Sequence, residues 1–187
     1  DVERSRGLGD VYKRQTTVAV LLAVAAFTKS AQFPFQAWLP DSMVAISPVS
    51  AYLHAAAMVK AGIFLLLVFS PVLAGNPVWS ALLIGSGLIT ALLGAVSAIR
   101  RHDLKGLLAY STMSQLGLLV TAIGIGTPVA LTAAIVHTVA HALFKSALFM
   151  LIGVVDHEAG TRDLRELAAR HVRMPVCLLY TSDAADE

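Results

Sequence analysis

The sequence predicts an all-α, polytopic membrane protein, and its composition and apolar patterning carry that prediction. Of its 187 residues, 57% are hydrophobic and 14% are charged, whereas soluble domains average about 45–50% apolar and about 25% charged. The mean hydropathy is +0.73. With 13 Gly and 7 Pro, the chain does not have the polar or Gly/Pro-dominated composition of a disordered or collagen-like protein.

Five apolar stretches approach the length of about 20 residues that a helix needs to cross a bilayer. The first covers residues 16–31, continues past Gln32 and is broken near Pro34, because proline lacks a backbone donor and clashes with the preceding turn. The others cover residues 49–73, 78–99, 104–125 and 129–155. We therefore expect about five transmembrane helices, with the first one broken.

The basic residues predict how these helices are oriented. Short cytoplasmic loops collect Lys and Arg, and such residues follow the third helix (Arg100, Arg101) and the fifth (Arg162, Arg165, Arg170, Arg173). The short loops 70–77 and 126–128 carry no charge. This alternation predicts a multi-pass protein of the cell inner (plasma) membrane with cytoplasmic basic loops. For residues 161–171, a solvated connector is favoured over an amphipathic surface helix.

The two ends differ from the middle. Residues 5–15, SRGLGDVYKRQ, resemble a translated transposase adapter from a sequencing library, and residues 177–187, CLLYTSDAADE, resemble the reverse complement of its companion. We expect residues 1–15 and 177–187 to be adapter-derived tails that are not native, ordinary polar tails being the alternative. The native part would then be residues 16–176, a fragment of a larger helical bundle.

Charged and titratable groups at membrane depth usually face a protein interior or a water-filled cavity. Lys29 lies next to the predicted break, where freed carbonyls and water can solvate its ammonium group, although it can also snorkel to the interface. His54 and Lys60 lie in the second helix, about 240° apart, and so on different faces. For His54, a helix-packing donor and a proton carrier are both open interpretations.

The strongest pattern lies in the fifth helix, where His137, His141 and Lys145 follow at i, i+4 and i+8. That spacing places all three on one face. Histidine titrates near neutral pH and a buried lysine can be brought there, so such a column can pass protons. A zinc site would need further Cys, His or carboxylate ligands, which are not evident.

Lys105 lies near the start of the fourth helix, for which Asp103 is a plausible N-terminal cap. A membrane anchor and a proton-input role explain Lys105 equally well. Residues 111–115 form a polar turn that suits helix contacts or bound water. We find no nucleotide loop, nucleophile elbow or Cys/His metal site, and the chain's small net charge of +2 gives no reason to expect nucleic-acid binding.

Four segments, taken in order, resemble the core motifs of the proton-translocating antiporter family. They are TKSAQFPFQAWLPDSM (28–43), PVSAYLHAAAMVKAG (48–62), DLKGLLAYSTMSQLG (103–117) and HTVAHALFKSALF (137–149). The family includes the large A-type component of Mrp-type sodium/proton antiporters and the antiporter-like subunits of respiratory complex I. The resemblance implies that residues 16–176 are a partial antiporter-like transmembrane domain.

The resemblance also implies roles for single residues. Lys29 matches the lysine at the broken helix, His54 the histidine of the next helix, and His137, His141 and Lys145 the central relay; Lys60 and Lys105 match further family positions. A partner glutamate is expected upstream of residue 16 and a terminal ionisable residue after residue 176. No cofactor and no metal are implied.

Within the family, the sequence around Lys60 and the segment DHEAGTRDLREL (156–167) favour the Mrp type over complex I. The expected function is therefore proton translocation within a multisubunit Na⁺/H⁺ antiporter, as a transporter subunit. The expected partners are other membrane subunits, H⁺, Na⁺ and the lipid bilayer. The alternatives are a non-redox, proton-pumping membrane subunit of NADH:quinone oxidoreductase, and an inactive truncated fragment.

Overall fold

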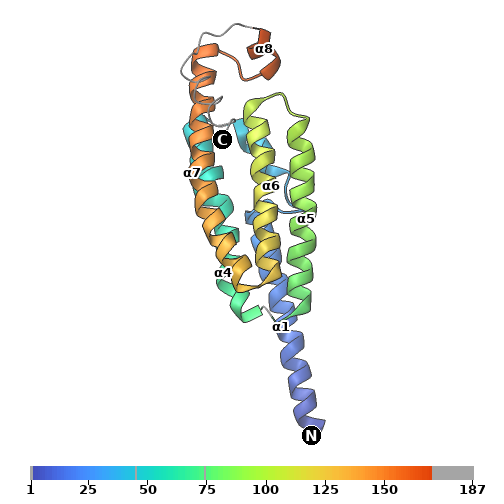
Figure 1. Cartoon of the computed structure of the whole chain (residues 1–187). Helices are drawn as coiled ribbons and strands as arrows, with labels where there is room; N and C mark the ends of the chain where they lie inside the picture. The colour runs from blue at the N-terminus through green and yellow to red at the C-terminus, as the bar shows by residue number, and fades with distance from the viewer. Residues whose placement is uncertain (1, 45, 74, 170–187) are drawn as a thin grey trace.

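The computed structural model describes residues 2–44, 46–73 and 75–169, which form a bundle of long helices running up and down side by side (Figure 1). In these residues the regular structure is helical, apart from one isolated bridge between Asp103 and Asp163. The all-α prediction is confirmed. The elements are α1 (Val2–Lys29), α2 (Trp38–Asp41), η1 (Ser42–Val44), α3 (Ser47–Ala51), η2 (Tyr52–Ala57), α4 (Met58–Leu73), α5 (Pro77–Ile99), α6 (Leu104–Ile125), α7 (Pro128–Ala159) and α8 (Leu164–Ala169).

Four helical segments are long and apolar enough to cross a membrane: Ser47–Leu73, Pro77–Ile99, Leu104–Ile125 and Pro128–Ala159. They correspond to the second to fifth predicted helices. The predicted first span is α1, which packs against α4 and α5. Its apolar part begins at Thr16 and ends with the helix at Lys29, which is shorter than the roughly 20 residues needed to cross alone.

Helix α1 differs from its prediction at both ends. It begins at Val2 and so includes the predicted N-terminal tail, and its first turns extend beyond the other helices (Figure 1). It ends at Lys29, before Pro34, whose ring has no N–H to donate to the Ser30 carbonyl and would clash with it in a continued helix. Ala31 has a positive φ of 50°. Trp38 Nε1 donates to the Thr28 carbonyl at 3.1 Å, which satisfies one of the carbonyls left open at the end of α1.

Segments α3, η2 and α4 form one continuous helix, whose middle part, η2, is a π-helix. A π-segment inside an α-helix has wider turns and is frequent at functional sites. His54 lies in η2 and is buried. The sequence pattern predicted a helix here but gave no sign of the π-segment.

Helices α5 and α6 approach each other at backbone distance. A Cβ added at Gly117 of α6 would lie 2.5 Å from the Ala91 nitrogen and 2.6 Å from the Gly87 carbonyl oxygen of α5. At Gly94 an added Cβ would lie 2.6 Å from the Ser114 nitrogen. Small residues allow this close packing of membrane helices, so the two helices form one tightly packed pair.

The α5–α6 turn and α8 lie at the same end of the bundle, and the uncharged α4–α5 and α6–α7 turns lie at the other end (Figure 1). Asp103 accepts a hydrogen bond from Gly106 N at 2.8 Å, which confirms it as the cap of α6. The side of the membrane on which each end lies stays a prediction.

The segment after α7 pairs with the α5–α6 turn. Leu104 N donates to Arg162 O at 3.1 Å, and Leu164 N donates to His102 O at 2.9 Å. Residues 164–169 form the short helix α8, with residues 164–166 exposed; whether it lies in solvent or on the membrane surface stays a prediction. Asp163 starts this helix by accepting from Arg165 N at 2.8 Å. Residues 170–173, and the predicted C-terminal tail at 177–187, lie outside the described residues.

Candidate functional site

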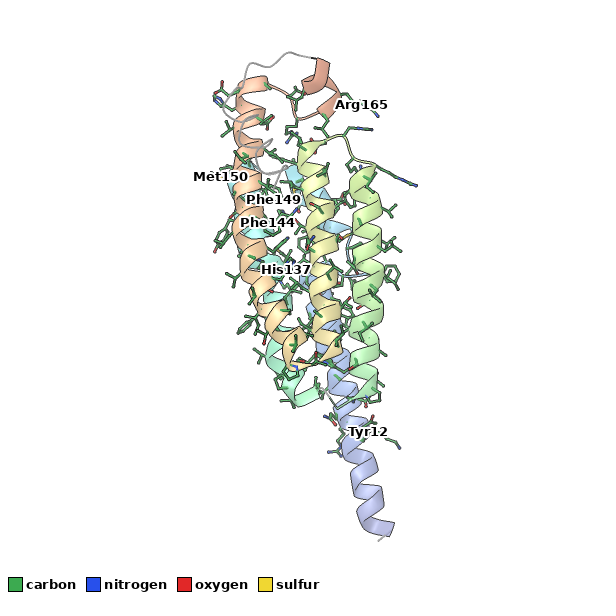
Figure 2. All side chains as sticks on the ribbon, in the orientation of Figure 1. Tyr12, His137, Phe144, Phe149, Met150 and Arg165 are labelled. Atoms are coloured by element: carbon green, nitrogen blue, oxygen red, sulfur yellow. The ribbon has the colours of Figure 1, made fainter. Side chains whose placement is uncertain are left out.

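Three titratable residues follow one another along α7, one per turn, as their spacing predicts. His137 is half-buried, whereas His141 is 0% exposed and Lys145 is 4% exposed. The ring centroids of His137 and His141 lie 6.2 Å apart. In Figure 2, His137 lies on the side of α7 that faces α6. The predicted column is therefore present as a continuous row in the protein interior.

Two polar residues of α6 bind this row. Lys145 Nζ donates to Ser111 Oγ at 2.5 Å, and His137 Nε2 lies 2.8 Å from Gln115 Oε1. Ser111 and Gln115 are four residues apart on α6, so they lie on one face. The sequence showed them as part of a polar turn, and the structure shows which groups they contact.

Lys60 reaches the same row from α4. Its Nζ donates to the Thr138 carbonyl of α7 at 2.5 Å, and its side chain is buried. Lys60, Lys145 and His137 are all close enough to act electrostatically on His141. Four titratable groups from α4 and α7 thus share one buried region.

His141 lies in the middle of this region. Its two ring nitrogens are buried and have no hydrogen-bond partner among the described residues. The ring of Phe144 packs against its edge, with 5.2 Å between the centroids. An unpaired buried polar group is costly, so the His141 ring is placed to bond water or a neighbouring group that moves.

His54 belongs to a separate set of contacts. Its Nε2 lies 3.1 Å from Ser42 Oγ, and its ring centroid lies 6.4 Å from that of Trp38 and 6.4 Å from that of Phe149. Its contacts differ from those of Lys60, in agreement with the different faces that the spacing predicts. Through Trp38 and Ser42, His54 is linked to the segment that follows the break in α1.

Lys29 and Lys105 lie apart from the row. Lys29 is exposed in the last turn of α1, beside the helix break. Lys105 is 3% exposed at the start of α6, where it interacts electrostatically with Asp103, Asp156 and Arg162. The structure therefore brings Lys60, His137, His141 and Lys145 together and places Lys29, His54 and Lys105 elsewhere.

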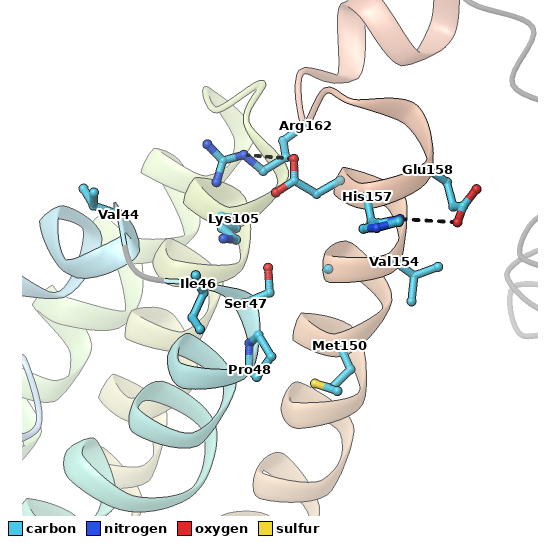
Figure 3. Close-up of a pocket in the computed structure, with 12 residues that line it drawn as sticks. Val44, Ile46, Ser47, Pro48, Lys105, Met150, Val154, His157, Glu158 and Arg162 are labelled. Atoms are coloured by element: carbon cyan, nitrogen blue, oxygen red, sulfur yellow. Dashed lines mark ion pairs between the residues drawn. The ribbon is translucent and has the colours of Figure 1, made fainter.

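Two cavities border these groups. One of about 350 Å³ lies between α6 and α7 and is lined by Gln115, Leu118, Leu119, Ala122, Ala133, Ala134 and His137. The other, of about 770 Å³, lies beside Lys105 at the end of the bundle that carries α8 (Figure 3). Polar groups of the site thus border space that extends between the helices.

The donor set of the row suits proton exchange better than metal binding. In residues 2–44, 46–73 and 75–169, no group of three or more His, Cys, Asp and Glu side chains is arranged to hold a metal ion. The row consists of lysine and histidine with hydroxyl, amide and carbonyl partners. Such groups can take up, hold and release protons.

Comparisons with known proteins agree on one family. Residues 5–182 match the family model described as "NADH:quinone oxidoreductase/Mrp antiporter, TM". This range includes parts of both predicted tails, whose origin stays a prediction.

The curated relatives are named as components of cation/proton antiporters. The probable K⁺/H⁺ antiporter component A/B of Rhizobium meliloti (strain 1021) is 56% identical over 86% of this chain and 16% of its own length. The Na⁺/H⁺ antiporter component A of Alkalihalophilus pseudofirmus (strain ATCC BAA-2126 / JCM 17055 / OF4) is 52% identical over 84% of this chain and 21% of its own. The chain therefore spans about a fifth or less of the length of these relatives.

Two solved structures have the same arrangement of helices. A chain of the Mrp complex from Dietzia sp. DQ12-45-1b is 71% identical, with a TM-score of 0.78 over 79% of this chain and 16% of that one. A chain of the membrane-bound sulfane sulfur reductase, an archaeal respiratory membrane complex, is 30% identical, with a TM-score of 0.71 over 81% of this chain and 32% of that one. Fold, motifs and relatives together establish that this chain is a multi-pass membrane protein of the NADH:quinone oxidoreductase/Mrp antiporter family.

Proposed function

We propose that this chain is part of the large A-type component of a multisubunit antiporter that exchanges H⁺ for a monovalent cation, and that Lys60, His137, His141 and Lys145 carry the protons. The observation behind this proposal is the buried row of titratable side chains between α4, α6 and α7. Ionisable groups at membrane depth are expensive and commonly mark proton relays. We include cation exchange in the proposal because the relatives are named as antiporter components.

Each part of the row has a distinct task in this proposal. Lys145 holds a proton as an ammonium group that donates to Ser111 Oγ, and it becomes a neutral amine when it passes the proton on. The unpaired ring of His141 accepts the proton through water or by rotation, and passes it to His137, whose ring centroid is 6.2 Å away. Lys60, held by the Thr138 carbonyl, supplies a charge beside His141 that favours onward transfer.

Lys29 and His54 form the outer part of the proposed route. Lys29 lies at the end of α1, where broken helices in transporters commonly place ion sites. We expect a glutamate from outside residues 16–176 to approach Lys29 and to change its proton affinity. His54, whose ring is near those of Trp38 and Phe149, lies next to the segment that links this break to α3.

The proposal also covers the identity of the exchanged cation. Two relatives carry names with different ions, K⁺ in one and Na⁺ in the other. We propose Na⁺, as the sequence motifs favour an Mrp-type sodium antiporter. Exchange measured with NaCl and KCl separately in the complete complex decides this point.

A membrane component of a respiratory complex is the second candidate. It is favoured by the 30% identity and TM-score of 0.71 to a chain of an archaeal respiratory complex. The two candidates differ in their driving force. An antiporter acidifies or alkalinises vesicles when a cation is added without an electron donor, whereas a respiratory pump needs reductant.

The test uses the complete protein in its complex, in everted membrane vesicles with a pH-sensitive dye. We expect Lys145→Ala to abolish cation-dependent proton exchange, and Lys29→Ala to do the same, with unchanged amounts of assembled complex. Ser146→Ala is the matched control, because Ser146 bonds within α7 to the carbonyls of Ala142 and Leu143. Normal exchange by both lysine variants would contradict the proposal.

A matched experiment distinguishes two explanations for missing activity: that residues 16–176 alone are an inactive fragment, or that the antiporter function is wrong. Residues 16–176 expressed alone are compared with the complete gene product in the same vesicles. Exchange by the complete protein and none by residues 16–176 is the expected result. Exchange by neither, in assembled complex, would remove the antiporter proposal.

A further inference from the structure

A second group of charges lies at the α8 end of the bundle, away from the row on α7. Arg162 Nε lies 3.7 Å from Asp103 Oδ1, at the start of α6, and 3.8 Å from Asp156 Oδ1, in the last turn of α7. One guanidinium group thus bridges the ends of two membrane helices. Figure 3 shows Arg162 next to Lys105, with its ion pair to α7 dashed.

The backbone also fixes Arg162 in place. Its carbonyl accepts a hydrogen bond from Leu104 N at 3.1 Å, within the pairing of the α5–α6 turn with the segment after α7. The Asp103 carboxylate is held by the first turn of α6, where it accepts from Gly106 N. Arg162 and Asp103 are therefore positioned before any ion pair forms, which lowers the entropy that the pair costs.

Lys105 lies beneath this bridge and is almost fully buried. Asp103, Asp156 and Arg162 all act on it electrostatically. The two carboxylates that pair with Arg162 therefore also lie near enough to Lys105 to act on its charge. A carboxylate that pairs closely with Arg162 attracts Lys105 less strongly, so a change in one interaction changes the other.

The 770 Å³ cavity lies beside this group. Its apolar wall comes from the start of α3 and from α7, and its polar wall comes from the charged end of the bundle. The lining residues are Val44, Ile46, Ser47, Pro48, Lys105, Met150, Gly153, Val154, Asp156, His157, Glu158 and Arg162. The charged groups that act on Lys105 are Asp103, which caps α6, Asp156 from α7, and Arg162 from the following segment. His157 and Glu158 from α7 line the same cavity, where they are exposed and pair with each other.

We propose that Arg162 is a positioning residue for proton passage at this end of the bundle: it holds Asp103 and Asp156 over the Lys105 cavity and competes with Lys105 for them. The inference rests on the proposed proton exchange and adds a residue and a site to it. Loss of a proton by Lys105 frees both carboxylates for Arg162 and draws the ends of α6 and α7 together. Protonation of Lys105 weakens that bridge.

The test uses the complete complex in vesicles and compares four variants over a range of pH. Arg162→Gln removes the charge and Arg162→Lys keeps it. Asp156→Asn removes one shared carboxylate. Arg165→Gln is the control, because Arg165 belongs to the same segment but bonds to His102 and does not line the cavity.

We expect Arg162→Gln to slow exchange at pH 7 by about threefold or more. The midpoint of the pH profile of exchange should also move by about half a unit or more toward alkaline pH, because one positive charge near Lys105 is lost. Arg162→Lys restores most of the profile, Asp156→Asn shifts the midpoint the opposite way, and Arg165→Gln matches the unaltered complex.

An unchanged profile for Arg162→Gln overturns the inference. An equal shift in Arg165→Gln, or no rescue by Arg162→Lys, also overturns it, because either result assigns the effect to folding of the segment. Failure of the proposed function is recognised separately, as absence of exchange in the unaltered complex or as normal exchange in the Lys145→Ala and Lys29→Ala variants.

Discussion

The Nζ atom of Lys145 lies 2.5 Å from the Oγ atom of Ser111, and this contact joins α7 to α6 in the protein interior. Burial is costly for a charged lysine, and the Ser111 hydroxyl supplies part of the solvation that this charge requires. Because α6 is packed against α5 at backbone distance, Ser111 is a fixed partner. Lys145 therefore depends for this polar contact on one hydroxyl of a rigid neighbour.

Replacing Ser111 tests this dependence. Hydrogen bonds to charged groups contribute about 1.5–3 kcal/mol, so we expect Ser111→Ala to lower the exchange rate by about tenfold or more. Ser86→Ala is the control, since Ser86 is half-buried and its hydroxyl bonds within its own helix to Leu82 and Leu83. Rates are measured in vesicles that contain equal amounts of complex. Equal rates in the two variants would remove Ser111 from the relay.

Gln115 holds the ring of His137. Its Oε1 lies 2.8 Å from His137 Nε2, and a neutral hydrogen bond contributes about 0.5–1.5 kcal/mol. We expect Gln115→Leu to lower proton exchange by about threefold to tenfold, because His137 loses its orientation. Leu118→Met, in the same cavity wall, should leave the rate unchanged. A Gln115→Leu rate equal to that of the control would show that this bond only packs the helices.

Lys60 is expected to be part of the relay although it comes from a different helix. Lys60→Met keeps the length of the side chain and removes the charge that acts on His141. We expect exchange to fall by about tenfold, with recovery of part of the rate in Lys60→Arg. The control is Met58→Leu, since Met58 is exposed on the same helix. Full activity of Lys60→Met would restrict the relay to α7.

The glycine contacts between α5 and α6 predict a difference in stability. A Cβ at Gly117 would meet backbone atoms at 2.5–2.9 Å, and overpacking costs about 1–3 kcal/mol. We expect Gly117→Ala to lower the thermal stability of the purified complex. Gly85→Ala should be neutral or stabilising by about 0.5–1 kcal/mol, because nothing lies within 4 Å of its added Cβ. Similar melting temperatures for the two variants would contradict the close approach.

The sequence predicted most of the helices because apolar length and proline spacing are local signals. The limits of α6 were predicted at residues 104–125, where the structure has them, since Asp103 marks the start and Gly126 the end. The start of α1 at Val2 was not predicted, because residues 1–15 were set aside as an adapter-derived tail, whose origin stays a prediction. The π-segment around His54 was also missed, since its wider turns leave no mark on the apolar pattern.

The candidate site was predicted in part. The i, i+4, i+8 spacing of His137, His141 and Lys145 places them on one face without further information. Their partners depend on how α4 and α6 pack against α7, and Ser111 lies 34 residues from Lys145 in the chain. Neither the Lys60 contact to Thr138 nor the Arg162 bridge is visible in a local pattern, because each joins elements that are distant in sequence.

The close contact of α5 and α6 has a mechanical consequence. Two backbones in contact leave no side chains between them to rearrange, so the pair deforms little when charges elsewhere change. Helix α7, by contrast, is attached to α6 through Lys145, His137 and the ion pairs of Arg162. These polar contacts add to the apolar packing of Leu108 and Ala109 of α6 against Phe149 and Ile152 of α7. A change of charge at Lys145, His137 or Arg162 would therefore act on the α6–α7 side of the bundle and leave the α5–α6 pair unchanged.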